Sequence, residues 1–281
     1  MKTPYKFITI ISVCTVVICF SCHKTETAKP ANVSAAVSTA DLGRQIALNF
    51  YAAITGKMGG ANINDGIKSP KNLSSVHGKM QTFDVNPLCG YTIDTAYNTT
   101  TTGHDTTFND RGRFKFTYMC GVLGTGNSPD GYLVADSITN VQTGPLFENF
   151  NAVAQAYNVH ALDNTFKLVS MGGQLSASTH FGVLNALGVA TSYSDFSAQY
   201  ALLGLTVNVS SGIADVVSGT STFTMTQANV ADPANPFNSP FNVYSGTITF
   251  LGNHMAHLSL QFNNTTTEYN INLLTGALSP A

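Results

Sequence analysis

The sequence predicts a mainly β protein, in which an antiparallel meander forms a strongly curved sheet or an open barrel and follows one N-terminal amphipathic helix. Three observations carry this prediction. Charged residues make up only 10% of the chain, whereas Thr, which packs well on a pleated surface, is abundant. Apolar and polar residues alternate with a period of two from Cys89 onward. A clear helical period occurs in one segment, residues 39–55. A β-sandwich is the alternative.

The N-terminal segment has the features of an export signal. Lys2 and Lys6 make the start of the chain positively charged, and an apolar stretch of 14 residues, Phe7–Phe20, follows. This stretch is too short for a helix that crosses a bilayer, which needs about 20 residues. A basic start, a short apolar core and a small residue before a cleavage site are typical of signal peptides.

The end of this segment, Cys19-Phe20-Ser21-Cys22, resembles the lipobox of bacterial lipoproteins, although Cys19 stands where that family usually has leucine. The resemblance implies cleavage between Ser21 and Cys22. It also implies that Cys22 carries a diacylglycerol, and two or three acyl chains such as palmitate give a stable membrane anchor. An ordinary secretory signal and an uncleaved anchor are the alternatives.

On this interpretation the chain has three parts: a lipoprotein signal peptide at 1–21, a flexible tether at 22–37 and a single β-rich domain at 38–281. The tether contains no large apolar residue except two valines. About 15 residues of flexible chain span roughly 20 Å. We expect the domain to be attached to the outer membrane or cell surface and to face the periplasm or the exterior.

The helix is predicted over residues 39–55. Ser38 or Thr39 can cap its start, Asp41 complements the helix dipole, and Gly56 can end it. It lacks the Lys- and Arg-rich polar face of membrane-surface helices, so we expect it to pack on the sheet. The apolar side chains that recur every four residues are Leu42, Ile46, Phe50 and Ile54.

A long aperiodic connection is expected at residues 56–87, which are rich in Gly, Asn, Ser, Pro and Lys. Four lysines lie here and offer charge to an anionic ligand, but a solvated loop is the preferred interpretation. These lysines are Lys57, Lys68, Lys71 and Lys79.

About ten to twelve strands are expected after this connection, and residues 181–200 are ambiguous. The alternation predicts one apolar and one polar face, as in antiparallel sheets with one solvated side. One predicted apolar face comprises Ala201, Leu203, Leu205, Val207 and Val209. One predicted polar face comprises Thr220, Thr222, Thr224 and Thr226.

Cys89 and Cys120 are the two cysteines left after Cys14, Cys19 and Cys22 are assigned to the signal and the anchor. An antiparallel register that places Cys89 opposite Cys120 also pairs Tyr91 with Tyr118 and Ile93 with Phe116, which are good cross-strand neighbours. A disulfide is therefore predicted, with two buried free thiols as the alternative. A redox role is not expected for this pair, because Cys89 and Cys120 do not form a Cys-x-x-Cys motif.

Several classes of function are disfavoured. From Phe116 to the end, Lys167 is the only basic residue against eight acidic ones, so this segment cannot present a basic stripe to nucleic acid. No Gly-x-Ser-x-Gly motif and no phosphate-binding glycine motif occurs. His254 and His257 are three residues apart and would point to opposite faces of a strand. The other histidines considered, His77, His104, His160 and His180, are scattered and solitary.

We therefore expect no metal site, no cofactor, no catalytic residues and no enzymatic activity. The predicted function is a lipid-anchored envelope lipoprotein that acts as a non-enzymatic binding module, with an apolar or lipid-like ligand held on the concave face of the sheet. Its abundant Phe, Tyr and Met residues supply the apolar surface for such a ligand. The alternative is a structural or protein-interaction lipoprotein of the outer membrane without a small-molecule ligand.

Overall fold

The computed structural model describes residues 38–67, 88–121, 123, 128–234 and 241–281, which fall within the unit Val33–Ala281. The predicted signal peptide and tether, with Ser21 and Cys22, lie outside the described residues. So do three of the four lysines of the 56–87 connection.

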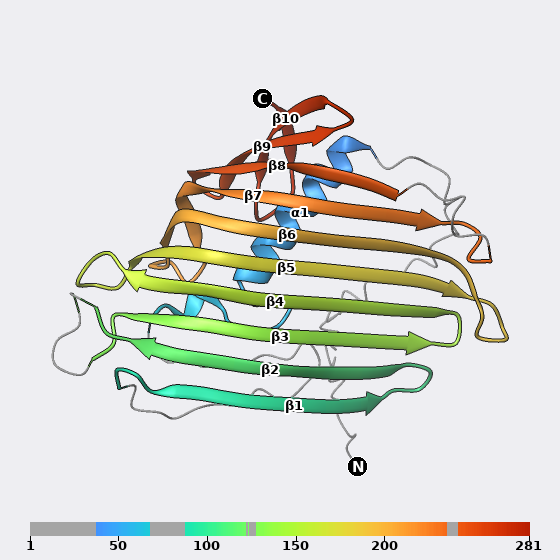
Figure 1. Ribbon diagram of the computed structural model, residues 1–281, viewed down its shortest axis with the longest axis horizontal. Helices are drawn as coiled ribbons and strands as arrows, with labels where there is room; N and C mark the ends of the chain where they lie inside the picture. Colours follow the sequence, from blue (N-terminus) through green and yellow to red (C-terminus); the bar gives the residue numbers. More distant parts are fainter. Residues whose placement is uncertain (1–37, 68–87, 122, 124–127, 235–240) are drawn as a thin grey trace, which may run out of the picture. The chain divides into compact units, whose positions relative to one another are not determined.

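Eleven strands form one antiparallel sheet, and each strand pairs with its neighbours in sequence (Figure 1). The sheet is open, with β1 at one edge and β11 at the other. The predicted meander is confirmed, and the described strands do not form the two sheets of a sandwich. The strands are β1 Thr92–Thr102, β2 Thr107–Met119, β3 Gly131–Gly144, β4 Phe147–Ala161, β5 Leu168–Leu184, β6 Ala190–Asn208, β7 Asp215–Val230, β8 Phe241–Gly252, β9 Met255–Phe262, β10 Thr265–Asn272 and β11 Leu278–Pro280.

The predicted helix is confirmed as α1, Thr39–Ile54. Ser38 is its N-cap, and the Ser38 hydroxyl accepts a hydrogen bond from the backbone N–H of Asp41 at 3.1 Å. The helix ends at Thr55, and Gly56 follows with φ of +69°, a conformation that glycine adopts without strain. A short 3-10 helix, η1, follows at Ile63–Asp65.

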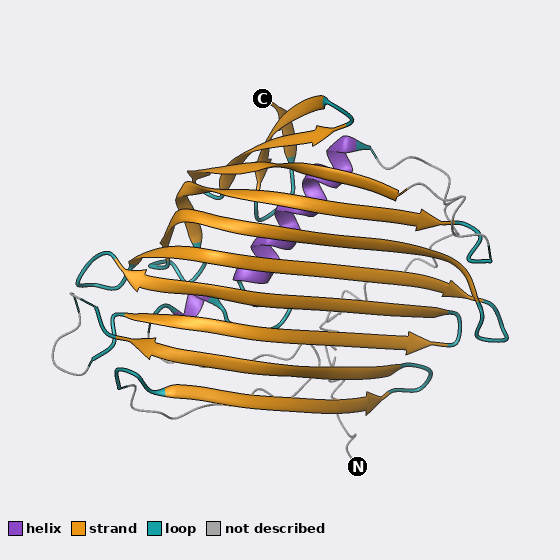
Figure 2. Ribbon diagram, in the orientation of Figure 1, coloured by secondary structure: helices purple, strands orange, loops and turns teal. Residues whose placement is uncertain are grey.

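Helix α1 crosses behind the strands in Figure 2 and packs on one face of the sheet. Phe50 is fully buried between the rings of Tyr200 on β6 and Phe250 on β8, with ring centroids 5.5 and 5.1 Å away. The Tyr200 hydroxyl donates to the carbonyl of Ile46 at 2.9 Å. Gly43 of the helix lies against Leu258 of β9, so closely that an added Cβ would be 2.8 Å from the Leu258 side chain. The space between α1 and the strands it crosses is thus filled by side chains of the protein itself.

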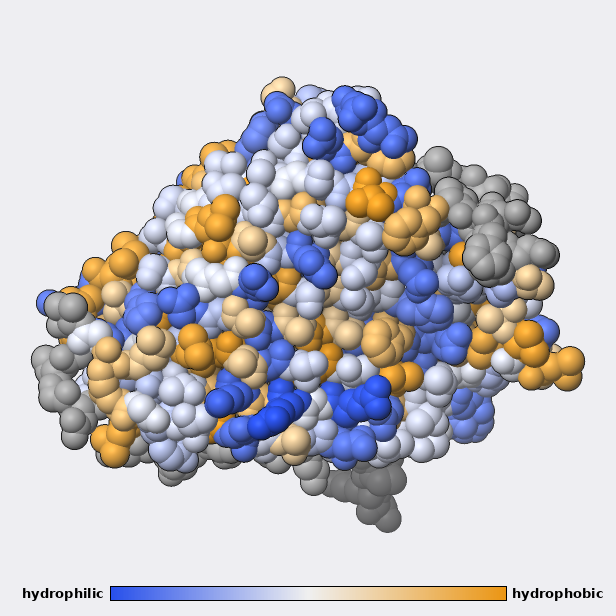
Figure 3. All heavy atoms as spheres, viewed as in Figure 1, coloured by the Kyte–Doolittle hydropathy of each residue, from blue (hydrophilic) through white to orange (hydrophobic). Residues whose placement is uncertain are grey.

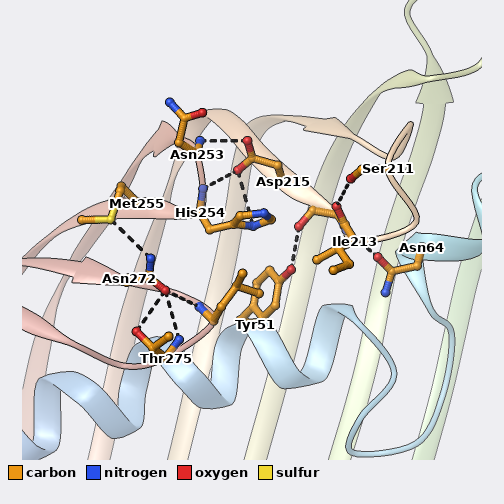
Figure 4. A network of polar contacts seen from close by, with 12 residues as sticks. Tyr51, Asn64, Ser211, Ile213, Asp215, Asn253, His254, Met255, Asn272 and Thr275 are labelled. Carbon is orange, nitrogen blue, oxygen red and sulfur yellow. Dashed lines mark hydrogen bonds and ion pairs between the residues drawn. The ribbon is translucent and has the colours of Figure 1, made fainter.

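A polar network fixes the end of α1 against the start of β7 and the β8–β9 turn (Figure 4). The buried Tyr51 hydroxyl donates to the carbonyl of Ala214 at 2.6 Å. Asp215 accepts hydrogen bonds from the backbone N–H groups of Asn253 at 2.8 Å and His254 at 2.7 Å. Both turn residues have positive φ, the geometry of a tight hairpin turn that follows the strand twist. Burial, followed by the charge of Asp215, raises the pKa of Tyr51 to about 12.

The polar face of β7 is confirmed, but the apolar face predicted for β6 is wrong at its centre. Leu202 is 3% exposed and Leu203 is 53% exposed, the reverse of the predicted alternation. The β6–β7 register shifts between Leu203 and Thr206, and Gly204 has φ of +60°. The irregularity inserts one residue and moves Ala201 to the face opposite Leu205. The ambiguous residues 181–200 belong to β5, β6 and the turn between them.

The predicted disulfide between Cys89 and Cys120 is present, with Cα atoms 5.4 Å apart. The predicted register is also confirmed: Ile93 lies opposite Phe116, and the Tyr118 backbone N–H donates to the Tyr91 carbonyl at 2.9 Å. The bond links positions 31 residues apart. In a chain-entropy model, a disulfide that closes a loop of this length stabilises the folded state by about 4 kcal/mol. It holds the start of β1 on the end of β2.

Candidate functional site: a trough on the outer face of the sheet

The two faces of the sheet have different surroundings. We call the face that packs against α1 the inner face and the opposite face, seen in Figure 3, the outer face. The inner face carries the large buried side chains, among them Phe114, Tyr157 and Tyr200. The outer face combines small, polar and a few exposed apolar residues, without a single large apolar area (Figure 3).

A hollow lies on the outer face of β2–β7. We call it the trough; its volume is about 690 Å³. Two rows of side chains form most of it. Within each row, the residues are cross-strand neighbours on six consecutive strands. The first row is Arg113, Ser137, Ala154, Ser176, Gln199 and Thr224. The second is Ala135, Ala156, Gln174, Ala201 and Thr222, which continues from Lys115 on β2.

The hollow exists because the floor residues on β3, β4 and β5 are mostly Ala and Ser, which leave the backbone near the surface. Since neighbouring strands are about 4.8 Å apart, a row across six strands extends roughly 24 Å. Along this length the lining combines methyl groups with hydroxyl and carboxamide groups. The trough therefore offers both apolar contact and hydrogen bonds to an extended molecule.

Basic residues stand at one end of the trough. Arg111, Arg113 and Lys115 alternate along β2, and the deepest blue in Figure 3 lies over this part of the sheet. Arg113 donates two hydrogen bonds to Asp94 of β1, at 3.0 and 2.8 Å. These hydrogen bonds lower the pKa of Asp94 and raise that of Arg113. The sheet thus places positive charge where an extended ligand would reach the β1 edge.

His180 is not solitary, contrary to the prediction from sequence. Its Nδ1 lies 2.5 Å from Asp195 directly opposite on β6, and its Nε2 lies 3.4 Å from Glu148 on β4. The Tyr193 ring lies 5.5 Å from the imidazole. These residues line or border a second outer-face hollow of about 560 Å³. Because both ring nitrogens face carboxylates, the imidazole does not have the serine-facing nitrogen of a hydrolytic triad.

A buried polar pair on the inner face was not predicted either. Asp136 is 6% exposed and Gln155 is 1% exposed. Both accept a hydrogen bond from the backbone N–H of Ala61, at 3.2 and 3.0 Å, and Gln155 donates to the carbonyl of Ala53 at 2.7 Å. Burial raises the pKa of Asp136 to about 7, although hydrogen bonds from the Ala61 and Gln155 backbones oppose the shift. This pair clamps the segment after α1 to the sheet.

His254 and His257 lie on opposite sides of the sheet, and His77 lies outside the described residues. His254 lies in the β8–β9 turn, where its ring faces Tyr51 on the inner side. His257 lies 3.7 Å from Glu268 of β10, on the face opposite the buried Ala256 and Leu258. Across the part of the chain that the structure describes, no group of three or more His, Cys, Asp or Glu residues is arranged to hold a metal ion.

Comparisons with other proteins do not indicate a function, so the function has to be inferred from the geometry of the site. No protein-family model matches the chain, and neither the curated proteins nor the solved structures searched include a significant match. Of the described helices, none combines the length and apolar character needed to cross a membrane.

Proposed function

We propose that the protein is a lipid-anchored, non-enzymatic binding module of the cell envelope, and that the trough is its binding surface. The observation that carries the proposal is the hollow of about 690 Å³ on the outer face of β2–β7. The apolar ligand predicted from composition was expected against the concave face, but the inner face beneath α1 is occupied by residues such as Phe50 and Ile46. The proposal therefore places the ligand on the opposite face.

The lining of the trough favours an extended, hydroxyl-rich polymer such as a glycan chain. Sugar rings have apolar CH faces and polar edges, and the two rows present Ala methyl groups beside Ser, Thr and Gln groups at strand spacing, about 4.8 Å. Arg113 can donate to an acidic sugar at the β2 end once it leaves Asp94. A protein partner is the alternative retained from the sequence.

The glycan proposal is tested with a microarray of purified oligosaccharides and the variant Ala154→Trp, which fills the trough. We expect affinity for a bound glycan to fall by about tenfold or more, a change of about 1.4 kcal/mol. Thr266→Trp is the matched control, because Thr266 lies in the same cross-strand row on β10, outside the trough. The Thr266→Trp variant should bind the glycan with the same affinity as the unmodified protein.

Two results would refute the proposal that the ligand is a glycan. One is no binding to any oligosaccharide on the array, and the other is equal binding by the Ala154→Trp variant. An organic-solvent extract of the same protein that contains a stoichiometric lipid would instead favour the apolar ligand predicted from composition.

The anchor is tested separately with Cys22→Ser. We expect the unmodified protein to sediment with membranes and to yield an N-terminal peptide that begins with an acylated Cys22, because cleavage precedes that residue in lipoproteins. The Cys22→Ser variant should lose both properties, and Cys19→Ser should retain them. An N-terminus other than Cys22, or membrane association that survives Cys22→Ser, would contradict a lipid anchor.

A further inference from the structure

The two edges of the sheet are protected very differently. At one edge, β11 has only three residues and ends at Pro280. At the other, β1 has 11 residues, and all of them pair with β2 on one side. Within the described residues no strand pairs with the other side of β1. Short strands and prolines are the usual devices that keep an edge from pairing with another chain, and only the β11 edge has them.

Strand β1 also lacks the other protective devices. Its sequence, TIDTAYNTTTT, contains no Pro and no Lys, and its register with β2 is uninterrupted. Thr, Ile and Tyr are residues that favour strands. The disulfide from Cys89, just before the strand, to Cys120 holds its start in place. The strand is thus held in a conformation ready to pair.

The charges at this edge permit pairing with an identical strand. Asp94 is the only charged residue of β1, and it is hydrogen-bonded to Arg113. In an antiparallel pair centred on Asn98, Asp94 of one copy lies opposite Thr102 of the other, so the two carboxylates do not oppose each other. The basic rows on the two β2 strands would be about 14 Å apart, beyond the screening length of about 8 Å at physiological salt.

We propose that β1 pairs antiparallel with β1 of a second copy of this chain, which joins two sheets into one. The contact is isologous, because the same strand serves both copies around a two-fold axis. Over 11 residues it adds about ten backbone hydrogen bonds. In an antiparallel pair, residues that are opposite each other point to the same face. The outer faces of both copies therefore lie on one side of the joined sheet.

The test uses the full chain, expressed with single substitutions and oxidised in the membrane fraction. Asn98→Cys places a thiol near the centre of β1, where it meets its symmetry mate. We expect a species of twice the mass on a non-reducing gel that returns to the monomer on reduction. Thr224→Cys is the matched control, because it is equally an exposed strand residue but lies on β7 inside the sheet. It should remain monomeric.

Ala96→Cys and Thr100→Cys extend the test to neighbouring registers. Sedimentation of the unmodified chain in detergent, which needs no substitution, should give a dimer, and Asn98→Pro should convert it to a monomer. A monomer for the unmodified chain, or no crosslink from any of the three positions, would overturn the proposal. So would a disulfide-linked species whose mass is not twice that of the chain, because the edge would then have a different occupant.

Discussion

Replacing Phe50 by alanine is expected to lower the free energy of unfolding by about 3–5 kcal/mol. Phe50 is fully buried, and its ring contacts those of Tyr200 and Phe250, which lie on different strands. The substitution removes a large apolar side chain and leaves a cavity that a helix fixed at both ends cannot close. At a denaturant dependence of about 2–3 kcal/mol per molar urea, the unfolding midpoint should fall by about 1–2 M.

Gln45→Ala is the matched control for this effect. Gln45 lies on the same helix but is only partly buried, and alanine is the better helix former. Its free energy of unfolding should change by no more than about 0.5 kcal/mol. Equal losses for the Phe50 and Gln45 variants would show that α1 does not contribute its apolar face to the core.

The second large effect is a loss of stability as pH rises, caused by Asp136. The pKa of this carboxyl is about 7 in the folded protein, against an ordinary value of 3.8. At a pH between 3.8 and about 7, the Asp136 carboxyl holds a proton in the folded state that it has released in the unfolded state. Stability must therefore fall as pH rises from about 4 to about 7 and then level off. The full fall is about 4 kcal/mol, since one pKa unit corresponds to about 1.4 kcal/mol.

Urea unfolding at pH 5 and pH 8 measures about 3 kcal/mol of this fall, the part above pH 5, in the unmodified protein, and the Asp136→Asn variant is compared at the same two pH values. The amide has nearly the same shape and cannot ionise, so the difference between the two proteins should shrink or reverse at pH 8. This double comparison removes the contribution of all other titrating groups. Parallel pH profiles for the two proteins would contradict a buried, protonated Asp136.

The helix and the first hairpin could be predicted from the sequence because their signals are local. Residues four apart, with Ser38 before them, define α1, and one candidate cysteine pair fixes the β1–β2 register. The β6 face was mispredicted because the alternation was continued through Gly204, although a glycine inside a strand often marks a bulge. A single inserted residue moves every following side chain to the other face.

The trough and the His180 contacts could not be predicted, because they depend on the registers of several strands at once. Ser137, Ala154 and Ser176 are far apart in the sequence and become neighbours only through two successive pairings. His180 meets Asp195 in the same way. Asp136 and Gln155 interrupt apolar faces, and the sequence does not show that a backbone N–H from the segment after α1 satisfies both.

The placement of α1 has a consequence for the order in which the protein is made. Each strand pairs with the one synthesised just before it, so the sheet can grow by adding hairpins as the chain lengthens. The helix is synthesised first, yet its partners come late: Tyr200 reaches Ile46 across 154 residues, and Tyr269 reaches Thr39 across 230. Strands β5 and β6 can cover part of the apolar face of α1 earlier, but the rest stays exposed until β8, β9 and β10 have been made. Chains that stop before β9 would leave part of this face exposed to solvent.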